Sequence, residues 1–252
     1  MTAEKLSFTV GLAGVPIGIR CVHKSNERFF EGYYTDKAPV ITVEPDENDL
    51  ARIEGSIVRS ALAEGREPVL SGAFTENCAL HDLIAEALPA HGVLLMHGSA
   101  LALDGEAYVF TAPSGTGKST HTRFWREAFG ERCVMIDDDK PLIAVSEDGI
   151  RVFGTPWNGK HRLGANISAP LRAIVRLGRG DENAVSPLPA GEAFTMLLSR
   201  VYSSRNADTM RRIAALIGTL TKSAAFYDLR CNLDPQSAMI AYRGITGGTG
   251  ER

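Results

Sequence analysis

The strongest constraint in this sequence is the stretch 112–120, which reads Ala-Pro-Ser-Gly-Thr-Gly-Lys-Ser-Thr. Gly115 and Gly117 let the backbone turn successive N–H groups inward, so that they form a nest for phosphate oxygens. Lys118 can reach the outer phosphates of a nucleotide, and the Ser119 hydroxyl can bind Mg²⁺. A helix opening at Lys118 adds the positive end of its dipole. The pattern is that of a P-loop with alanine in place of the usual first glycine; the simpler alternative is a glycine-rich turn.

A P-loop follows a strand and opens a helix, and the flanking sequence agrees with both. Residues 107–111 are a short apolar run, and residues 118–129 have an amphipathic helical pattern closed by Gly130. The motif also predicts which residues bind the nucleotide. They are Ser114, Gly115, Thr116, Gly117, Lys118, Ser119 and Thr120.

Length and charge bound the remaining possibilities. A chain of 252 residues is long enough for one sizeable domain, or for a core plus a smaller lobe. Its net charge of −3 gives no sign of a surface that coats nucleic acid, and no apolar run reaches the roughly 18 residues that span a bilayer. The first residues lack the apolar core of a signal peptide, so we expect a cytoplasmic protein without membrane partners. The 4 cysteines are scattered and indicate neither a zinc site nor a disulfide framework.

Residues 1–75 predict a small β-rich lobe with one helix. Three segments, 6–10, 15–19 and 39–43, alternate in polarity or are rich in β-forming residues. Apolar residues then recur at helical spacing between Leu50 and Ala61, and Gly65 is a stop signal. A second helix is expected near 76–88, at the start of the next domain.

Residues 76–245 predict a P-loop core built on a mixed sheet. Asp104-Gly105 and Asp148-Gly149 each separate two apolar segments, which is a strong hairpin signal. The strands expected around them are 93–103, 107–111, 142–145 and 150–153. Hairpins on both sides of the P-loop unit favour a mixed α/β (α+β) sheet over a purely parallel one.

The rest of the core has weaker signals. Helices are predicted at 190–202, 208–223 and 235–242, and a strand at 226–231. The glycine-rich residues 246–252 are expected to be a disordered tail.

A strand at 133–136 runs into three consecutive acidic residues, Asp137, Asp138 and Asp139. The Mg²⁺ of a bound nucleotide needs carboxylates, and α/β sheets place ligands at the carboxyl ends of strands. One carboxylate can hold the metal and another can take the proton from an attacking hydroxyl. If the strand persists, Asp137 and Asp139 point together; if the chain turns at Asp138, Asp138 and Asp139 both reach the site. A solvated acidic turn is the alternative.

Two further segments carry candidate residues. His97 lies in the predicted strand 93–103, where a packed histidine is the simpler interpretation. The segment 154–162 is a Gly- and Pro-containing loop with Trp157, Lys160 and Arg162. Lys160 and Arg162 can stabilise charge on a transferred phosphoryl group or hold an anionic substrate. A solvated basic turn is the alternative.

Together these residues resemble the HPr kinase/phosphorylase family and its smaller relatives, which share a core with phosphoenolpyruvate carboxykinases. The resemblance covers about residues 94–162. It rests on Met96-His97-Gly98 before a hairpin, the glycine-rich loop, a single helix, and a strand ending in paired aspartates. It implies a mixed-sheet P-loop core of that type, with ATP and Mg²⁺ as cofactors and His97 at the catalytic site.

The resemblance also assigns the acidic residues. Matching Lys140-Pro141 after the pair places the family's aspartates on Asp138 and Asp139. Asp138 is then the expected general base, and the metal is expected at Ser119, Asp139 and Asp138. The loop 154–160 looks like the small relatives, whereas the Arg- and Pro-rich signature of true HPr kinases is not evident, so HPr itself is a doubtful substrate.

These observations predict an ATP-dependent kinase that transfers a phosphoryl group to a hydroxyl, on a serine of a protein or peptide or on a small metabolite. The catalytic residues expected are Asp138, His97, Lys118, Lys160 and Arg162. One alternative is a nucleotide-binding sensor with little turnover, and another is a carboxykinase-like lyase, for which this chain is short. The acceptor and the physiological donor stay open, and a homo-oligomer is compatible with the sequence.

Overall fold

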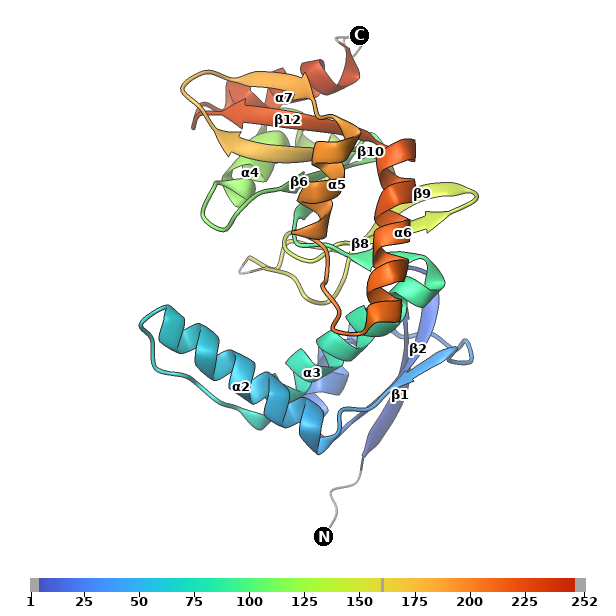
Figure 1. The fold of residues 1–252 in the computed structure, drawn as a ribbon. Helices are drawn as coiled ribbons and strands as arrows, with labels where there is room; N and C mark the ends of the chain where they lie inside the picture. The colour runs from blue at the N-terminus through green and yellow to red at the C-terminus, as the bar shows by residue number, and fades with distance from the viewer. Residues whose placement is uncertain (1–4, 160, 248–252) are drawn as a thin grey trace. The chain divides into compact units, whose positions relative to one another are not determined.

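The computed structural model describes residues 5–159 and 161–247, which divide into two compact units, one ending at His91 and the other starting at Gly92 (Figure 1). The sequence placed the boundary between residues 75 and 76. That point lies inside a helix, α3 (Gly72–Ala87), which packs against the other helices of the first unit. No helix in the described part of the chain is long and apolar enough to cross a membrane.

The first unit combines a small sheet with helices. Its elements are β1 (Leu6–Leu12), β2 (Val15–Cys21), α1 (Lys24–Phe29), η1 (Glu31–Tyr33), β3 (Ile41–Val43), α2 (Glu47–Ala63), α3 and η2 (Leu88–His91). β1 and β2 form an antiparallel hairpin, and β3 pairs parallel to β2. α2 begins at a capping box between Asp46 and Asp49, which satisfies backbone N–H groups that the first turn leaves unpaired. The three predicted strands and the predicted helix are therefore present.

Glu76 fastens α3 to the segment that follows β2. Its buried carboxylate accepts hydrogen bonds from the backbone N–H groups of Val22 (2.6 Å) and His23 (3.0 Å) and from the Asn26 amide (2.8 Å). Burial acts to raise the pKa of Glu76, but these hydrogen bonds outweigh it and hold the pKa below its usual value.

The second unit is built on a mixed sheet, which confirms the α/β expectation. Its strands are β4 (Val93–Leu95), β5 (Ser99–Leu103), β6 (Glu106–Thr111), β7 (Cys133–Asp137), β8 (Leu142–Ser146), β9 (Gly149–Phe153), β10 (Ser168–Arg179), β11 (Ala184–Pro187) and β12 (Ala225–Cys231). They run in the order β4-β8-β9-β10-β6-β5-β7, with β12 also beside β10 and β11 beside β12. β10 is parallel to β6 and β12 but antiparallel to β9, so the sheet contains both kinds of pairing.

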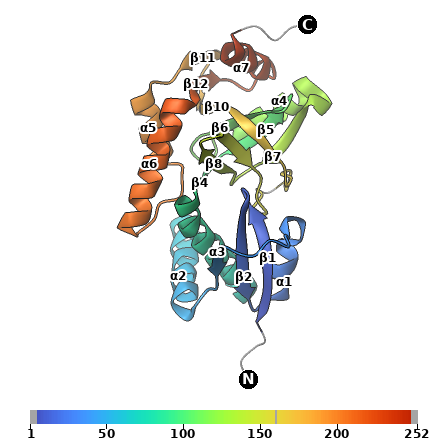
Figure 2. The same ribbon diagram turned by 90° about the vertical axis from the view of Figure 1, so that its right-hand side faces the viewer.

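Helices cover both faces of this sheet. They are α4 (Lys118–Phe129), η3 (Gly130–Arg132), α5 (Ala190–Leu198), α6 (Ala207–Ser223) and α7 (Gln236–Thr246). Alternate residues of β6 serve the two faces: Tyr108 and Phe110 pack with α4 and α7, whereas Val109 packs with α5 and α6. Figure 2 shows α5 and α6 together on one side of these strands. The glycine-rich loop is thus set at the end of a strand that is buried on both faces.

Several predicted boundaries need correction. The strand expected at 93–103 is broken at Met96–Gly98, because β4 pairs with β8 whereas β5 pairs with β6 and β7. The helix expected at 190–202 ends at Leu198. α7 extends to Thr246, and Gly247 ends it with a φ of 70°, so the expected tail starts inside that helix; residues 248–252 lie outside the described part.

Two strands were not predicted. β10 pairs with β6, β9 and β12 at the centre of the sheet, and β11 pairs with β12. No strand or helix was expected between residues 154 and 189. The Asp104-Gly105 hairpin, in contrast, is confirmed: both residues have positive φ, 51° and 83°, as a type I′ turn requires.

Candidate functional site

The glycine-rich loop joins β6 to α4, as the motif requires. Gly115 and Gly117 have φ values of 75° and 117°, in the region that favours glycine, and a Cβ at either position would meet nothing within 4 Å. The loop therefore favours glycine at both positions because of these φ values, and not because a side chain would lack space. Gly117 is the N-cap of α4 and gives it no side-chain cap, so the first N–H groups of that helix face outward without an intrahelical partner.

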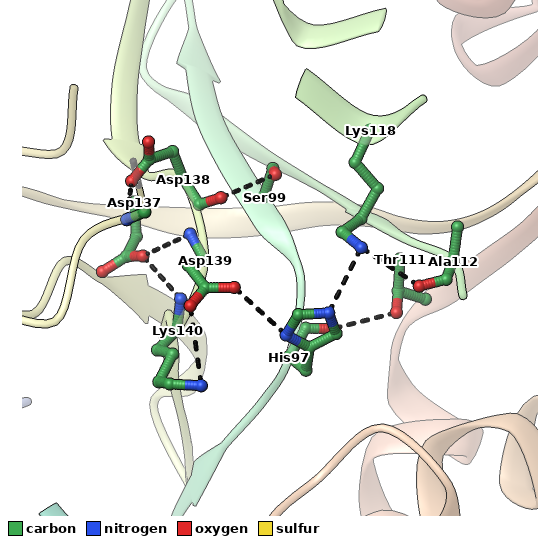
Figure 3. Close-up of polar contacts among 10 residues, drawn as sticks. His97, Ser99, Thr111, Ala112, Lys118, Asp137, Asp138, Asp139 and Lys140 are labelled. Atoms are coloured by element: carbon green, nitrogen blue, oxygen red, sulfur yellow. Dashed lines mark hydrogen bonds and ion pairs between the residues drawn. The ribbon is translucent and has the colours of Figure 1, made fainter. Parts of the chain in front are cut away.

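Lys118, His97 and Asp139 form a continuous polar chain beside the loop (Figure 3). The Lys118 Nζ lies 3.2 Å from the His97 Nε2 and also donates to the Ala112 carbonyl oxygen at 3.1 Å. On the other side of the imidazole, His97 Nδ1 lies 3.2 Å from Asp139 Oδ1. Because an ammonium group can only donate, Nε2 accepts and the imidazole proton is on Nδ1, directed at Asp139. Three segments far apart in sequence thus meet at one imidazole.

Long-range backbone contacts hold His97 in that place. Its N–H donates to the Arg200 carbonyl oxygen at 2.6 Å, and its own carbonyl oxygen accepts from the Thr111 hydroxyl at 2.9 Å. The next residue, Gly98, donates to the Asp139 carbonyl oxygen at 3.0 Å, and a Cβ on Gly98 would press against the Phe110 carbonyl oxygen. The break between β4 and β5 is therefore what brings His97 to the loop.

Burial and these neighbouring charges shift the pKa values of Lys118 and Asp139. Burial lowers the pKa of Lys118; Asp139 opposes the change, and the charge of Arg200 adds to it. Burial acts to raise the pKa of Asp139, but its hydrogen bond with His97 and the charge of Lys140 outweigh that effect and hold it below the usual range. Asp139 therefore stays ionised next to the loop.

The three aspartates take three different surroundings. Asp137 has 0% exposure and accepts hydrogen bonds from the N–H groups of Asp139 (2.9 Å), Lys140 (2.7 Å) and Thr155 (2.9 Å) and from the Thr155 hydroxyl (2.8 Å). Burial raises the pKa of Asp137 to about 6, although these bonds act in the opposite direction. β7 ends at Asp137, so the chain turns where the second sequence alternative required it to turn.

Asp138 and Asp139 nevertheless point to different partners. The Asp138 carboxylate accepts from the Gly159 N–H at 2.5 Å, whereas the Asp139 carboxylate is directed at His97 (Figure 3). Among the described residues, no group of three or more His, Cys, Asp or Glu side chains is placed to hold a metal ion. A metal at this site would therefore depend on oxygens from a bound ligand or water as well as from the protein.

The loop 154–162 contributes in part. Thr155 and Trp157 are buried, and Gly159 binds Asp138, so this loop closes over the acidic turn. Arg162 is exposed with a φ of 48°, and its N–H donates to the Gly159 carbonyl oxygen. Lys160 lies outside the described residues.

Of the clefts beside the glycine-rich loop, two are large, and their basic walls were not predicted. One, of about 900 Å³, runs from Thr111–Pro113 to strands β10 and β12 and helix α5. The other, of about 1230 Å³, includes Gly115–Gly117, Thr120 and Phe124. Arg179, at the end of β10, lines both and donates to the Gly115 carbonyl oxygen at 2.7 Å. Because β10 itself was not expected, its arginines carried no signal in the sequence.

Comparison with known proteins does not show a family for this chain. No family model matches the chain, and no curated protein sequence matches it. Among solved structures, an HPr(Ser) kinase/phosphatase from Coxiella burnetii matches over 51% of this chain and 97% of its own, with 10% sequence identity and a TM-score of 0.27. That is a weak similarity to a kinase, and at this TM-score we draw no conclusion from it about fold or function.

Proposed function

We propose that this protein is an ATP-dependent kinase that transfers a phosphoryl group to a hydroxyl, on a core of the HPr kinase type. The observation that carries the proposal is the chain Lys118–His97–Asp139 beside a glycine-rich loop with two positive-φ glycines. A structural glycine turn has no need of a half-buried lysine whose ammonium is linked to a histidine and a carboxylate.

The loop suits the phosphates of ATP. The unpaired N–H groups at the start of α4 and the positive end of its dipole favour an anion, and Lys118 supplies a positive charge. Phosphate oxygens would compete with His97 and Ala112 for the Lys118 ammonium, since these are its partners in the structure. Ser114, Thr116 and Thr120 complete the loop that surrounds them.

Magnesium fits the oxygen donors at this end of the sheet. The Ser119 hydroxyl on α4 and the ionised Asp139 carboxylate are the hard ligands that Mg²⁺ prefers, and Asp138 directly precedes Asp139 in sequence. When bound, Mg²⁺ would neutralise charge on the β- and γ-phosphates. His97 keeps Asp139 oriented by donating its Nδ1 proton to it.

The transfer step assigns the carboxylates separate roles. The acceptor oxygen forms a bond to the γ-phosphorus while the bond from that phosphorus to the β–γ bridging oxygen breaks, which leaves ADP. Asp138 takes the acceptor's hydroxyl proton, because the carboxylate of Asp139 is bound to His97, whereas that of Asp138 accepts from the Gly159 N–H and has no contact with His97 among the described residues. Lys118, with Lys160 and Arg162 from the neighbouring loop, would stabilise the charge on the moving phosphoryl group.

The test separates binding from transfer. Purified protein is incubated with Mg²⁺ and γ-labelled ATP against a library of hydroxyl metabolites and serine peptides, and calorimetry measures the affinity for Mg²⁺-ATP. We expect Lys118→Ala to lose both labelling and most of the affinity, and Asp138→Asn to lose labelling while the affinity is kept. Asp148→Asn, at an exposed turn, is the matched control.

Two results would contradict the proposal. Unchanged ATP affinity in Lys118→Ala would remove the phosphate role of the loop. Tight binding with no labelled product from any acceptor would favour the alternative of a nucleotide sensor.

A further inference from the structure

The 900 Å³ cleft beside the glycine-rich loop is unusually basic. Four arginines line it, Arg176, Arg179, Arg200 and Arg230, against two carboxylates, Asp228 and Glu192. Both carboxylates bind the same arginine: Arg176 Nε lies 2.6 Å from Asp228 and its terminal nitrogen 3.2 Å from Glu192. The cleft therefore has two more positive than negative side chains.

The remaining guanidinium groups have little to neutralise them. Arg179 donates to a carbonyl oxygen of the loop. The side chains of Arg200 and Arg230 have neither a hydrogen bond nor an ion pair within the part of the chain that the structure describes. Guanidinium groups with free donors are the usual partners of phosphate and carboxylate groups, which they bind through paired hydrogen bonds.

The cleft also adjoins the proposed transfer site. Thr111 lines it and donates its hydroxyl proton to the His97 carbonyl oxygen. Arg200 lines it and accepts from the His97 N–H, and the charge of Arg200 reaches the Lys118 ammonium closely enough to disfavour its protonation. A ligand in this cleft would thus contact residues that are hydrogen-bonded to His97 and Lys118.

The nucleoside has a separate place. The second cleft contains the loop glycines together with Thr120 and Phe124 of α4, and it shares Arg179 and Arg230 with the first cleft; of the two clefts, Arg200 lines only the first. A nucleotide whose phosphates occupy the loop can rest its sugar and base there, against an aromatic side chain. The first cleft is then left for the other reactant.

We propose that the cleft lined by Arg200 and Arg230 holds the phosphoryl acceptor, and that this acceptor is a small hydroxyl compound bearing a phosphate or carboxylate group. The inference rests on the proposed kinase function. The volume is in the range of clefts that take small molecules, and the charge selects an anion. Arg230 and Arg200 bind the anionic group while the hydroxyl faces the γ-phosphate.

The experiment measures anion binding without requiring turnover. The full chain is saturated with Mg²⁺ and β,γ-imido-ATP, so that the loop is filled, and then titrated with glycerol 3-phosphate, with malate and with neutral glycerol. Calorimetry gives each affinity, and the titrations are repeated on nucleotide-free protein. Arg200→Gln is compared with Arg212→Gln, an exposed arginine of α6 away from the cleft, and thermal unfolding confirms that each variant folds.

We expect one or both anions to bind the nucleotide-loaded protein while glycerol does not, and Arg200→Gln to lose about tenfold or more in anion affinity. Its affinity for the ATP analogue should match that of Arg212→Gln. Equal losses for analogue and anion would assign the cleft to the nucleotide and overturn the inference. Equal anion binding by both variants would also overturn the inference. The same holds if protein that binds the analogue binds no anion at all. If the analogue itself fails to bind, the proposed function fails, and the titration of nucleotide-free protein still decides whether the cleft takes anions.

Discussion

Asp137 should be a structural residue although it stands beside the proposed catalytic pair. Its two carboxylate oxygens accept from four donors, with Asp139 and Lys140 on one oxygen and Thr155 on the other. In Asp137→Asn the amide oxygen can keep the first pair, while the new NH₂ group faces Thr155. The Thr155 hydroxyl can turn to accept, but its N–H can only donate, so one buried backbone donor is left unpaired.

The cost follows from that single lost partner. An unsatisfied buried N–H destabilises a fold by about 1–3 kcal/mol, so we expect Asp137→Asn to lower the free energy of unfolding by about 2 kcal/mol. For a chain of this size that corresponds to a fall of roughly 4–8 °C in the midpoint of thermal unfolding. Asp137→Ala removes all four acceptor contacts and should cost more, about 3–5 kcal/mol.

Scanning calorimetry and the transfer assay together check the reasoning. Asp138→Asn is the matched comparison. Among the described residues the Asp138 carboxylate accepts one hydrogen bond, from Gly159, so this variant should lose transfer with a small change in stability. Asp137→Asn should show the reverse pattern, with binding and transfer largely kept below its unfolding midpoint. An Asp137→Asn variant of unchanged stability that has lost transfer would refute the assignment and make Asp137 the catalytic carboxylate.

Three further predictions follow from single positions. Because the pKa of Glu76 is lowered in the folded state, its carboxylate stabilises the first unit above the unfolded-state pKa of about 4.3. This contribution is lost as the pH falls through the lower folded-state pKa. The unfolding midpoint measured between pH 3 and 6 should therefore depend less on pH in Glu76→Gln than in the wild type. Gly117→Ala places a side chain at a φ of 117°, so it should lower the free energy of unfolding by about 1–3 kcal/mol and weaken the Mg²⁺-ATP affinity measured by calorimetry. An unaltered affinity would show that the loop does not need this conformation. Gly154→Ala would drive a Cβ into the carbonyl oxygens of Ala165 and Ile136, so we expect little folded protein by circular dichroism, and a native-like melting curve would contradict it.

Local signals were enough to predict the elements on either side of the glycine-rich loop. The hairpin at Asp104-Gly105 needs two residues that tolerate positive φ, and α4 begins and ends at glycines, so these boundaries depend on residues at the boundaries themselves. β10 was missed for the opposite reason. It contains Pro170 and charged residues and shows no simple alternation, because its two ends have different neighbours, β9 at one end and β6 with β12 at the other.

The candidate site shows the same limit at the level of single side chains. The sequence could select His97, Lys118 and the aspartates by residue type and spacing, but their roles depend on contacts that spacing does not encode. Asp137 is taken out of the site by Thr155, and His97 is brought into it by Arg200 and Thr111, none of which lies near its partner in sequence.

The same contacts would couple the proposed nucleotide site to the proposed acceptor site. In the structure the Lys118 ammonium is bound to His97, and His97 is bound through its backbone to Arg200 at the wall of the basic cleft. Phosphates that draw Lys118 into the loop would free the His97 Nε2, whereas the backbone contact would keep the imidazole beside the cleft. Under the proposed function, His97 would then be available to the acceptor only when the nucleotide is present. Because two sites coupled in this way affect each other reciprocally, the acceptor should also strengthen nucleotide binding by the same factor, an effect that His97→Ala would abolish.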